Sequence, residues 1–333
     1  MHKGSYKMSF DIGIDVAKDK IDCLWLRDPV NLKVKTKVFA NTAKGFKSLK
    51  LWIEKNVSTE FEHIFVSLEA TGVYHEALSY ALFDMGLQVS VVNPAFIRDF
   101  AKGLGVRGKT DKKDSMVLAR YSNMVRPSLW SPEPKEIRTL KAMISRLTGL
   151  EKDLQRESNR LEKAEISKAS IIVIDSIKSM ISHLELEVKR IEKMIDDHID
   201  KNPTLKKDRA ILQSIPGVGD VLSREMLSVL HSRKFVRASQ AAAFVGVVPK
   251  LWESGKMKGR TALCKNGPGR LRAKLYMAAV AAIQHNPDIK IQYKRLLQAG
   301  KTKMQALGAA MRKLVQICFG VLKHQCEYRP QTN

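Results

Sequence analysis

The sequence predicts an α/β domain at the N-terminus followed by a mostly helical remainder. Apolar and polar residues alternate in three successive segments, strand-like and helix-like segments then alternate, and from about residue 132 the apolar spacing becomes that of long helices. A chain of 333 residues with 44% hydrophobic residues can give two or three domains their own cores. We expect domains at residues 1–130, 131–203 and 204–333.

The first domain is expected to begin with three strands, in the segments 10–14, 21–25 and 33–39. The later elements are expected to be helices over 43–55 and 74–85 and strands over 63–68 and 88–92. Asn93 and Pro94 end the last of these strands. Three strands followed by α/β alternation is the order of a ribonuclease H-like domain, whereas a doubly wound nucleotide-binding domain more often begins with a strand, a glycine-rich loop and a helix.

The middle of the chain, from about Pro132 to His198, predicts long helices with narrow apolar stripes. One stripe has leucine at every seventh position, and the other has apolar residues at alternating steps of four and three. The residues are Leu140, Leu147, Leu154, Leu161, Ile177, Ile181, Leu184, Val188, Ile191 and Ile195. We favour a dimerising coiled-coil arm. A two-helix hairpin packed on the first domain is the alternative, because sequence does not separate pairing within a chain from pairing between chains.

Residues 205–330 predict a mostly helical, strongly basic domain. The segment 215–219, Ile-Pro-Gly-Val-Gly, lies between two helical stretches and resembles the turn of a helix-hairpin-helix element. In such a turn, glycines let backbone amides approach a phosphate. A plain connecting turn explains the pattern equally well, so we assign this segment no catalytic role.

The charge of the chain points to a polyanion as partner. Lys and Arg number 58 against 34 Asp and Glu, which gives a formal net charge of +24. Nucleic acid is the first expectation, since no run of eighteen apolar residues and no apolar signal-peptide core favour a membrane. We therefore expect a soluble, cytoplasmic protein. The four cysteines are far apart and form no C-x-x-C pair, which predicts buried, reduced thiols rather than a zinc site or disulfides.

Four acidic residues form the candidate catalytic set. Asp15 and Glu69 each end an apolar strand, where rigid backbone can direct a carboxylate into a cleft. Asp111 and Asp114 open a helix, and their spacing of three places them on one face. Asp11 lies on the same strand face as Asp15 and competes with it. The simpler readings are a solvated acid at a strand end and, for Asp111, a helix N-cap.

Four carboxylates this close together need a cation to offset their repulsion, and Mg²⁺ or Mn²⁺ is the natural ligand for such oxygens. Two such ions about 4 Å apart activate the attacking oxygen and stabilise the leaving oxygen in a displacement at phosphorus. The segment 11–15 also resembles the first phosphate loop of actin-like and sugar-kinase ATPases. The glycine-rich second loop that those enzymes need does not occur, which makes a kinase the minor alternative.

A basic strip in the last domain surrounds a second candidate. Ser254 precedes a glycine in an expected loop, and a turn serine in a phosphate-binding strip is the simpler reading. The strip is expected to contact phosphates through Lys250, Lys256, Lys258, Arg260, Lys265, Arg270, Arg272 and Lys274. Lys109, Lys112 and Lys113, next to the paired aspartates, are expected to do the same.

Six motifs in series resemble the DEDD insertion-sequence transposases related to the Piv DNA invertase. They run in order over nearly the whole chain, and together they are far more specific than any one of them. The motifs occupy residues 12–18, 69–74, 92–94, 109–114, 214–219 and 246–255.

The resemblance implies a RuvC-like N-terminal domain, a coiled-coil dimerisation arm and a C-terminal transposase domain. It implies that Asp15, Glu69, Asp111 and Asp114 are the metal-binding residues, which settles the choice of Asp15 over Asp11. Ser254 is then the nucleophile, and its ester with phosphate keeps the energy of the broken phosphodiester, so that a strand end rejoins without ATP.

The same resemblance implies partners for the protein. Many members use a bridge RNA that pairs with donor and target DNA, and assemble as a tetramer of two dimers in which Ser254 of one protomer completes the RuvC-like site of another. It implies a prokaryotic protein of the nucleoid. A RuvC-like nuclease that uses water and a non-enzymatic nucleic-acid-binding protein are the alternative functions.

Overall fold

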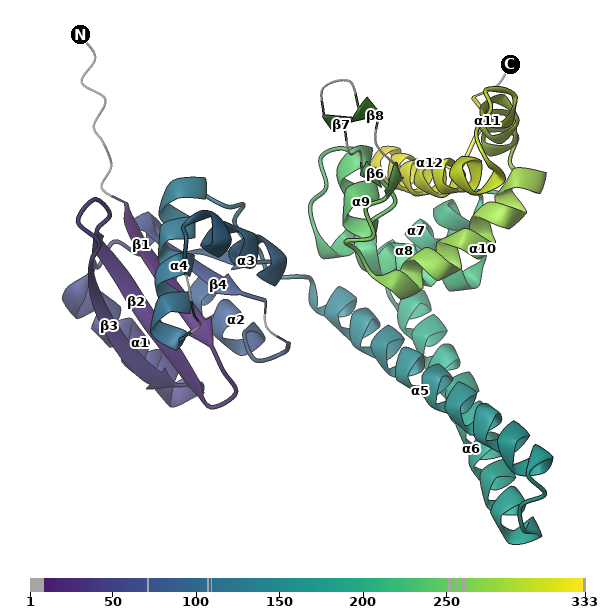
Figure 1. Cartoon of the computed structure of the whole chain (residues 1–333), viewed down its shortest axis with the longest axis horizontal. Helices are drawn as coiled ribbons and strands as arrows, with labels where there is room; N and C mark the ends of the chain where they lie inside the picture. Colours follow the sequence, from purple (N-terminus) through teal and green to yellow (C-terminus); the bar gives the residue numbers. More distant parts are fainter. Residues whose placement is uncertain are drawn as a thin grey trace. The chain divides into compact units, whose positions relative to one another are not determined.

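The computed structural model describes residues 9–331 apart from 71, 107, 109, 251–252, 255–256 and 259–260. For residues 253, 254, 257 and 258 it describes the backbone alone. The chain divides into two compact units, of which the first ends at Pro132 and the second begins at Glu133 (Figure 1). The second unit contains both the long helices and the helical domain that follows them. The predicted boundary between those two parts stays a prediction.

The first unit is built on a five-stranded sheet with the order β3-β2-β1-β4-β5. Its strands are β1 (Phe10–Val16), β2 (Lys20–Asp28), β3 (Lys33–Ala40), β4 (Ile64–Glu69) and β5 (Gln88–Val92). The first three strands are antiparallel, and β4 and β5 run parallel to β1. The predicted α/β class and the succession of strands are therefore confirmed, in the order that the sequence indicated for a ribonuclease H-like domain.

Helices cover both faces of this sheet (Figure 1). The helices are α1 (Ala43–Asn56), α2 (Glu76–Asp84), α3 (Pro94–Gly103) and α4 (Asp111–Val125), with a 3-10 turn, η1 (Phe61–His63), before β4. Phe46 of α1 and Leu78 of α2 are buried in one core cluster with the isoleucines of β1, whereas Leu24 of β2 packs with α4 on the other face. Helix α3 was not predicted. Asn93 ends the strand as expected, but its side chain also accepts a hydrogen bond from Ala95 N at 2.9 Å and so begins a helix.

The long helices α5 (Lys135–Ile166) and α6 (Ile171–Lys201) pack against each other within the chain. Leu140 and Leu147 of the predicted heptad stripe are buried, and so is Ile195 of the second stripe. Near the turn between the helices, Ile171 and Ile172 are exposed. In the part nearer Glu133, the stripes are buried in a core that the two long helices share with the helices that follow them. Whether the hairpin also pairs with a second copy stays a prediction.

The rest of the second unit is helical around its own core, with an excursion of short strands. The helices are α7 (Pro203–Gln213), α8 (Asp220–Ser232), α9 (Ala238–Val245), α10 (Gly269–His285), α11 (Pro287–Gln298) and α12 (Lys303–His324). The strands are β6 (Pro249–Lys250), β7 (Glu253–Ser254), β8 (Met257–Lys258) and β9 (Ala262–Leu263). In the turn before α8, Gly217 has a φ of +99° and lies so close to α10 that a Cβ would stand 2.7 Å from the Cβ of Ala282. This packing favours the plain connecting turn over a phosphate-binding hairpin.

Two of the four cysteines are not fully buried, whereas all four were expected to be. Cys23 and Cys318 are buried, Cys264 is half-buried and Cys326 is exposed. Burial accordingly raises the pKa of the Cys318 thiol to about 12. Among the described residues, no helix is both long and apolar enough to span a bilayer.

Candidate active site

Three residues of strand β1, Asp11, Gly13 and Asp15, face α4, and each lies next to a different part of that helix. Ile12 and Ile14 lie in the core on the α1 side, so the alternation of a strand directs Asp11, Gly13 and Asp15 to the opposite face. Asp11 contacts the last turn of α4, Gly13 lies under its middle, and Asp15 faces its first turn. One strand therefore both supports α4 and carries an acid that meets it.

Gly13 allows α4 to lie in contact with the backbone of the sheet. A Cβ atom at position 13 would stand 2.0 Å from the carbonyl oxygen of Ser115 and 2.4 Å from the backbone nitrogen of Ala119. Ser115 also ties the start of α4 to β2, because its hydroxyl donates to the backbone oxygen of Asp22 at 2.8 Å. The acids at the start of α4 are thereby held next to the end of β1.

The four predicted acids line one cleft of about 670 Å³. Asp15 lies near the end of β1 and Glu69 is the last residue of β4. Because β1 and β4 are parallel neighbours, both side chains lie at the same edge of the sheet. Asp111 and Asp114 come from the first turn of α4, which Thr110 caps. The structure thus brings together the complete acidic set that the sequence proposed.

The electrostatics of the cleft agree with this proximity. The pKa of Asp15 rises from 3.8 to about 6, first through burial and then through the negative charges of Asp114, Asp111, Asp22 and Glu69. Neighbouring carboxylates repel one another when all of them are ionised. A cation in this cleft would relieve that repulsion.

Two residues beside the acids of the cleft were missed from the sequence, Lys20 and Asp22. Asp22 pairs with Asp15 across the β1–β2 hairpin and is a fifth acid at this edge. Lys20 Nζ lies 2.6 Å from Asp111 Oδ2 and 3.1 Å from Asp22 Oδ2. Its hydrogen bonds to Asp111 and then to Asp22 raise the pKa of Lys20 to about 12. The signal available in the sequence was the short turn 17–19, which sets residue 22 opposite residue 15.

The donor set fits a divalent cation. All its members offer carboxylate oxygens, which are the ligands that Mg²⁺ and Mn²⁺ prefer. In the part of the chain that the structure describes, no three Asp, Glu, His or Cys side chains have converged to the arrangement of a metal site. The Lys20 ammonium group instead neutralises the Asp111 side of the cleft.

Asp11, the competitor of Asp15, is occupied elsewhere. It is 2% exposed, and its Oδ1 lies 2.7 Å from Arg126 NH1 while its Oδ2 accepts from Asn123 Nδ2 at 2.8 Å. We expect Asp11→Ala to lower the free energy of unfolding by about 3 kcal/mol, because it leaves a guanidinium without its buried partner. Urea denaturation measures this change. An unchanged midpoint would refute the structural role of Asp11.

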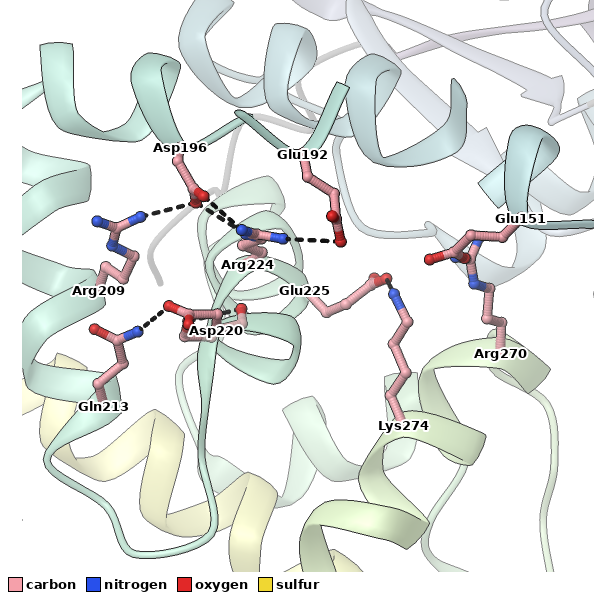
Figure 2. Close-up of polar contacts among 11 residues, drawn as sticks. Glu151, Glu192, Asp196, Arg209, Gln213, Asp220, Arg224, Glu225, Arg270 and Lys274 are labelled. Carbon is pink, nitrogen blue, oxygen red and sulfur yellow. Dashed lines mark hydrogen bonds and ion pairs between the residues drawn. The ribbon is translucent and has the colours of Figure 1, made fainter. Parts of the chain in front are cut away.

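The basic strip of the last domain divides into two kinds of residue. Arg270 pairs with Glu151 of α5, and Lys274 Nζ lies 2.6 Å from Glu225 Oε1 of α8 (Figure 2). In the same region Arg224 pairs with Asp196, which ties α6 to α8. Arg270 therefore joins α10 to the long helix α5, and Lys274 joins α10 to α8. The predicted phosphate contacts of these two residues stay a prediction.

Arg272 is also engaged within the protein. Its guanidinium donates to the carbonyl oxygens of Gly267 at 2.5 Å and Val245 at 3.3 Å, and so joins the two ends of the excursion that carries β6 to β9. Lys250 and Lys265 are exposed on that excursion, as Lys112 and Lys113 are at the start of α4. Lys109, Lys256 and Arg260 lie outside the described residues.

Ser254 lies in a short strand rather than the expected loop. Its backbone pairs with Met257, and Glu253 pairs with Lys258, in the antiparallel pair of β7 and β8. Outside this pair, β6 and β9 form a second antiparallel pair. The side chains of Ser254 and Lys258 are beyond what the structure describes.

A sheet with a carboxylate-lined cleft, in a chain that also carries a basic helical unit, is typical of enzymes that cut and rejoin nucleic acid. Comparison with known families agrees. A model of DEDD transposases of the IS110 type matches residues 12–164, and a model described as the transposase IS116/IS110/IS902 family matches residues 209–294.

Curated relatives extend the match over nearly the whole chain. The pilin gene-inverting protein of Moraxella bovis is 31% identical over 94% of this chain and 95% of its own length, and that of Moraxella lacunata is 32% identical over the same shares. The transposase of insertion sequence element IS1111A from Coxiella burnetii is 22% identical over 74% of each chain. The chain belongs to the DEDD transposase family of the IS110 and IS116 type, which includes DNA-inverting members.

Among solved structures, RuvC of T. thermophilus in complex with a Holliday junction is similar at a TM-score of 0.25 and 12% identity, over 37% of this chain and 100% of that chain.

Proposed function

We propose that this transposase cuts and rejoins DNA strands at the carboxylate cleft, through a covalent link to Ser254, with a bridge RNA selecting the sites. The observation that carries the proposal is the convergence of Asp15, Glu69, Asp111 and Asp114 on one cleft, in a family of transposases. Four acids in a chain with a net charge of +24 make chemical sense at a site that handles phosphate.

Each step of the proposed reaction conserves a phosphodiester. The hydroxyl oxygen of Ser254 attacks phosphorus, its proton is released, and the displaced deoxyribose oxygen takes up a proton. A hydroxyl of the new DNA partner then attacks the same phosphorus and restores the serine. Because every bond broken is replaced by one of equal kind, joining needs no ATP, whereas attack by water would discard the ester.

The four acids would hold the divalent cation that this reaction uses. Asp15 and Glu69 project from rigid strand ends, and Asp111 and Asp114 from a helix start that Gly13 holds in place. Divalent metal, Mg²⁺ or Mn²⁺, supplies Lewis acidity at the phosphoryl oxygens when bound. For the acids to converge on it, Lys20 must leave Asp111.

The proposed assembly is a dimer that pairs through the α5–α6 hairpin and doubles to a tetramer, with Ser254 of one protomer serving the acids of another. Exposed apolar side chains near the end of the hairpin support pairing there, with Ile166 76%, Ile171 67% and Ile172 78% exposed. Exposed lysines beside the paired aspartates and in the basic strip are proposed to contact the nucleic acids.

The decisive experiment is a search for the covalent intermediate. Wild-type protein, Mg²⁺, RNA transcribed from the noncoding flank of the gene and a donor–target DNA pair are expected to give a protein–DNA adduct that survives denaturing electrophoresis. Ser254→Ala removes the nucleophilic oxygen and is expected to lower adduct formation more than about 1,000-fold.

The outcomes separate the candidate functions. An adduct that persists in Ser254→Ala contradicts the serine assignment. Cleavage without adduct, indifferent to Ser254, identifies a nuclease that uses water. Salt-sensitive binding without cleavage under any metal or RNA condition identifies an architectural binder. Adduct formation that is independent of the RNA removes the guide from the proposal.

A further inference from the structure

The first unit carries a lysine-rich surface away from the residues discussed so far. No Asp or Glu occurs between Asp28 and Glu54, and the same stretch contains six lysines. They continue into Lys55, and all seven are exposed. We call this surface the lysine face, and it consists of Lys33, Lys35, Lys37, Lys44, Lys47, Lys50 and Lys55.

The fold collects these lysines on one side of the sheet. Lys35 and Lys37 pair in register with Trp25 and Cys23, which belong to the core on the α1 side. Lys33, Lys35 and Lys37 therefore project on the face that α1 covers, opposite α4. Lys35 Nζ donates to Asn56 Oδ1 at the end of α1 at 2.5 Å, which joins the strand lysines to the helix lysines.

The lysine face is not neutralised by neighbouring acids. In this segment, which the structure describes throughout, the one ion pair that the seven lysines form joins Lys50 Nζ and Glu54 Oε1 at 3.9 Å. The long helices offer a contrast, because Arg156 pairs with Asp153 and Arg190 with Glu187 one turn away. A surface adapted for solubility mixes both signs of charge, so a one-sign surface points to an anionic partner.

One end of the lysine face meets the rim of the carboxylate cleft. Asn41, just before α1, donates to the backbone oxygens of Ala17 at 2.9 Å and Tyr74 at 3.0 Å, and both residues line the cleft. From there the 14 residues of α1 extend away for about 21 Å, at about 1.5 Å per residue. That length matches about six base pairs of a duplex, at about 3.4 Å per step.

We propose that the lysine face binds the phosphate backbone of duplex DNA that continues from the carboxylate cleft. The inference rests on the proposed function for its choice of ligand, because DNA with a phosphate at the acids meets the lysine face if it continues over this rim. The lysine face contacts phosphates without reading bases, since flexible ammonium groups supply point charges rather than a fixed hydrogen-bonding pattern.

The test compares two variants that remove the same charge. The first carries Lys35→Gln, Lys37→Gln, Lys44→Gln and Lys47→Gln. The control carries Lys152→Gln, Lys163→Gln, Lys178→Gln and Lys193→Gln on the α5–α6 hairpin. Binding of a 40-base-pair DNA duplex of arbitrary sequence is measured by fluorescence anisotropy between about 50 and 300 mM salt, with circular dichroism confirming that both variants fold. An RNA duplex of the same sequence is measured in parallel.

The first variant is expected to bind DNA at least about tenfold more weakly and to flatten the plot of log affinity against log salt by about two to four, at about 0.9 per lost phosphate contact. The control is expected to keep the wild-type slope. Equal losses in both variants, no loss in either, or a loss confined to the RNA duplex would each overturn the proposal. Wild-type protein that binds the duplex in this way but never cuts DNA would refute the proposed function while leaving the lysine face intact.

Discussion

Asp15→Asn is expected to abolish strand cleavage and, without metal, to make the protein more stable at pH 8. The substitution removes a proposed metal ligand, and since even residues behind the ligands contribute 10- to 100-fold, activity should fall by more than about 100-fold. Stability should change in the opposite direction, because the folded protein raises the pKa of Asp15 from 3.8 to about 6. Folding therefore favours the protonated carboxyl group.

The pH dependence follows from the direction of this shift. The contribution of Asp15 to stability is fully present below pH 3.8 and is lost as the pH rises through about 6. At pH 8 in EDTA, wild type should be less stable than Asp15→Asn by about 1 to 3 kcal/mol, and the two should converge near pH 4. Urea denaturation at pH 4, 6 and 8 measures this difference.

Added Mg²⁺ provides the internal control for this variant. It should stabilise the wild type through binding to the folded state and should have little effect on Asp15→Asn. If Mg²⁺ stabilises both proteins equally, or if the variant still cuts DNA, Asp15 is not a metal ligand. Comparison with Asp11→Ala sharpens the result, because two aspartates on one face of one strand should change stability in opposite directions.

Gly13→Ala is expected to lower DNA cleavage, although Gly13 is not one of the four acids, and to destabilise the first unit. The new methyl group would stand 2.0 Å from the backbone oxygen of Ser115, and backbone cannot move aside as a flexible side chain does. Helix α4 would have to shift outward, carrying Asp111 and Asp114 away from Asp15. We expect a loss of at least about 2 kcal/mol in the free energy of unfolding and at least about 100-fold in cleavage.

Gly103→Ala is the matched control, since a Cβ at position 103 meets nothing within 4 Å and the residue lies at the end of α3 in the same unit. Thermal unfolding and cleavage assays on the two variants test the argument. A Gly13→Ala protein with wild-type melting temperature and activity would show that α4 does not depend on this contact.

Much of the first unit was predictable because its elements depend on local pattern. Alternation identified the first three strands, and the helical spacing of apolar residues identified α1 and α2. The acids were found because a charge directly after an apolar strand is costly unless it leaves the core. Helix α3 was missed, because the Asn93-Pro94 pair that ends a strand also begins a helix, and the short apolar segment after it does not distinguish the two.

The remaining features depend on neighbours that are distant in the sequence. The register of a hairpin sets Asp22 beside Asp15, and the reach of Lys20 brings its ammonium group to Asp111. Arg270 and Lys274 were predicted to contact phosphate, and the structure adds that each pairs with an acid from another helix, Glu151 or Glu225. A run of positive charge in a sequence carries no information on which of its members face an acid of the same protein.

The sequence by itself determined the order of the elements, the family and the four acids at strand and helix ends, since each is a local pattern that survives without coordinates. The family resemblance already selected Asp15 over Asp11, but only the tertiary structure shows the physical difference between them. Both side chains point to the same face of β1, and what distinguishes them is the helix that crosses it. Helix α4 presents Asn123 and Arg126 to Asp11 at one end and Asp111 and Asp114 to Asp15 at the other. The direction in which that helix packs, possible only over Gly13, makes one aspartate a structural partner and leaves the other in the cleft.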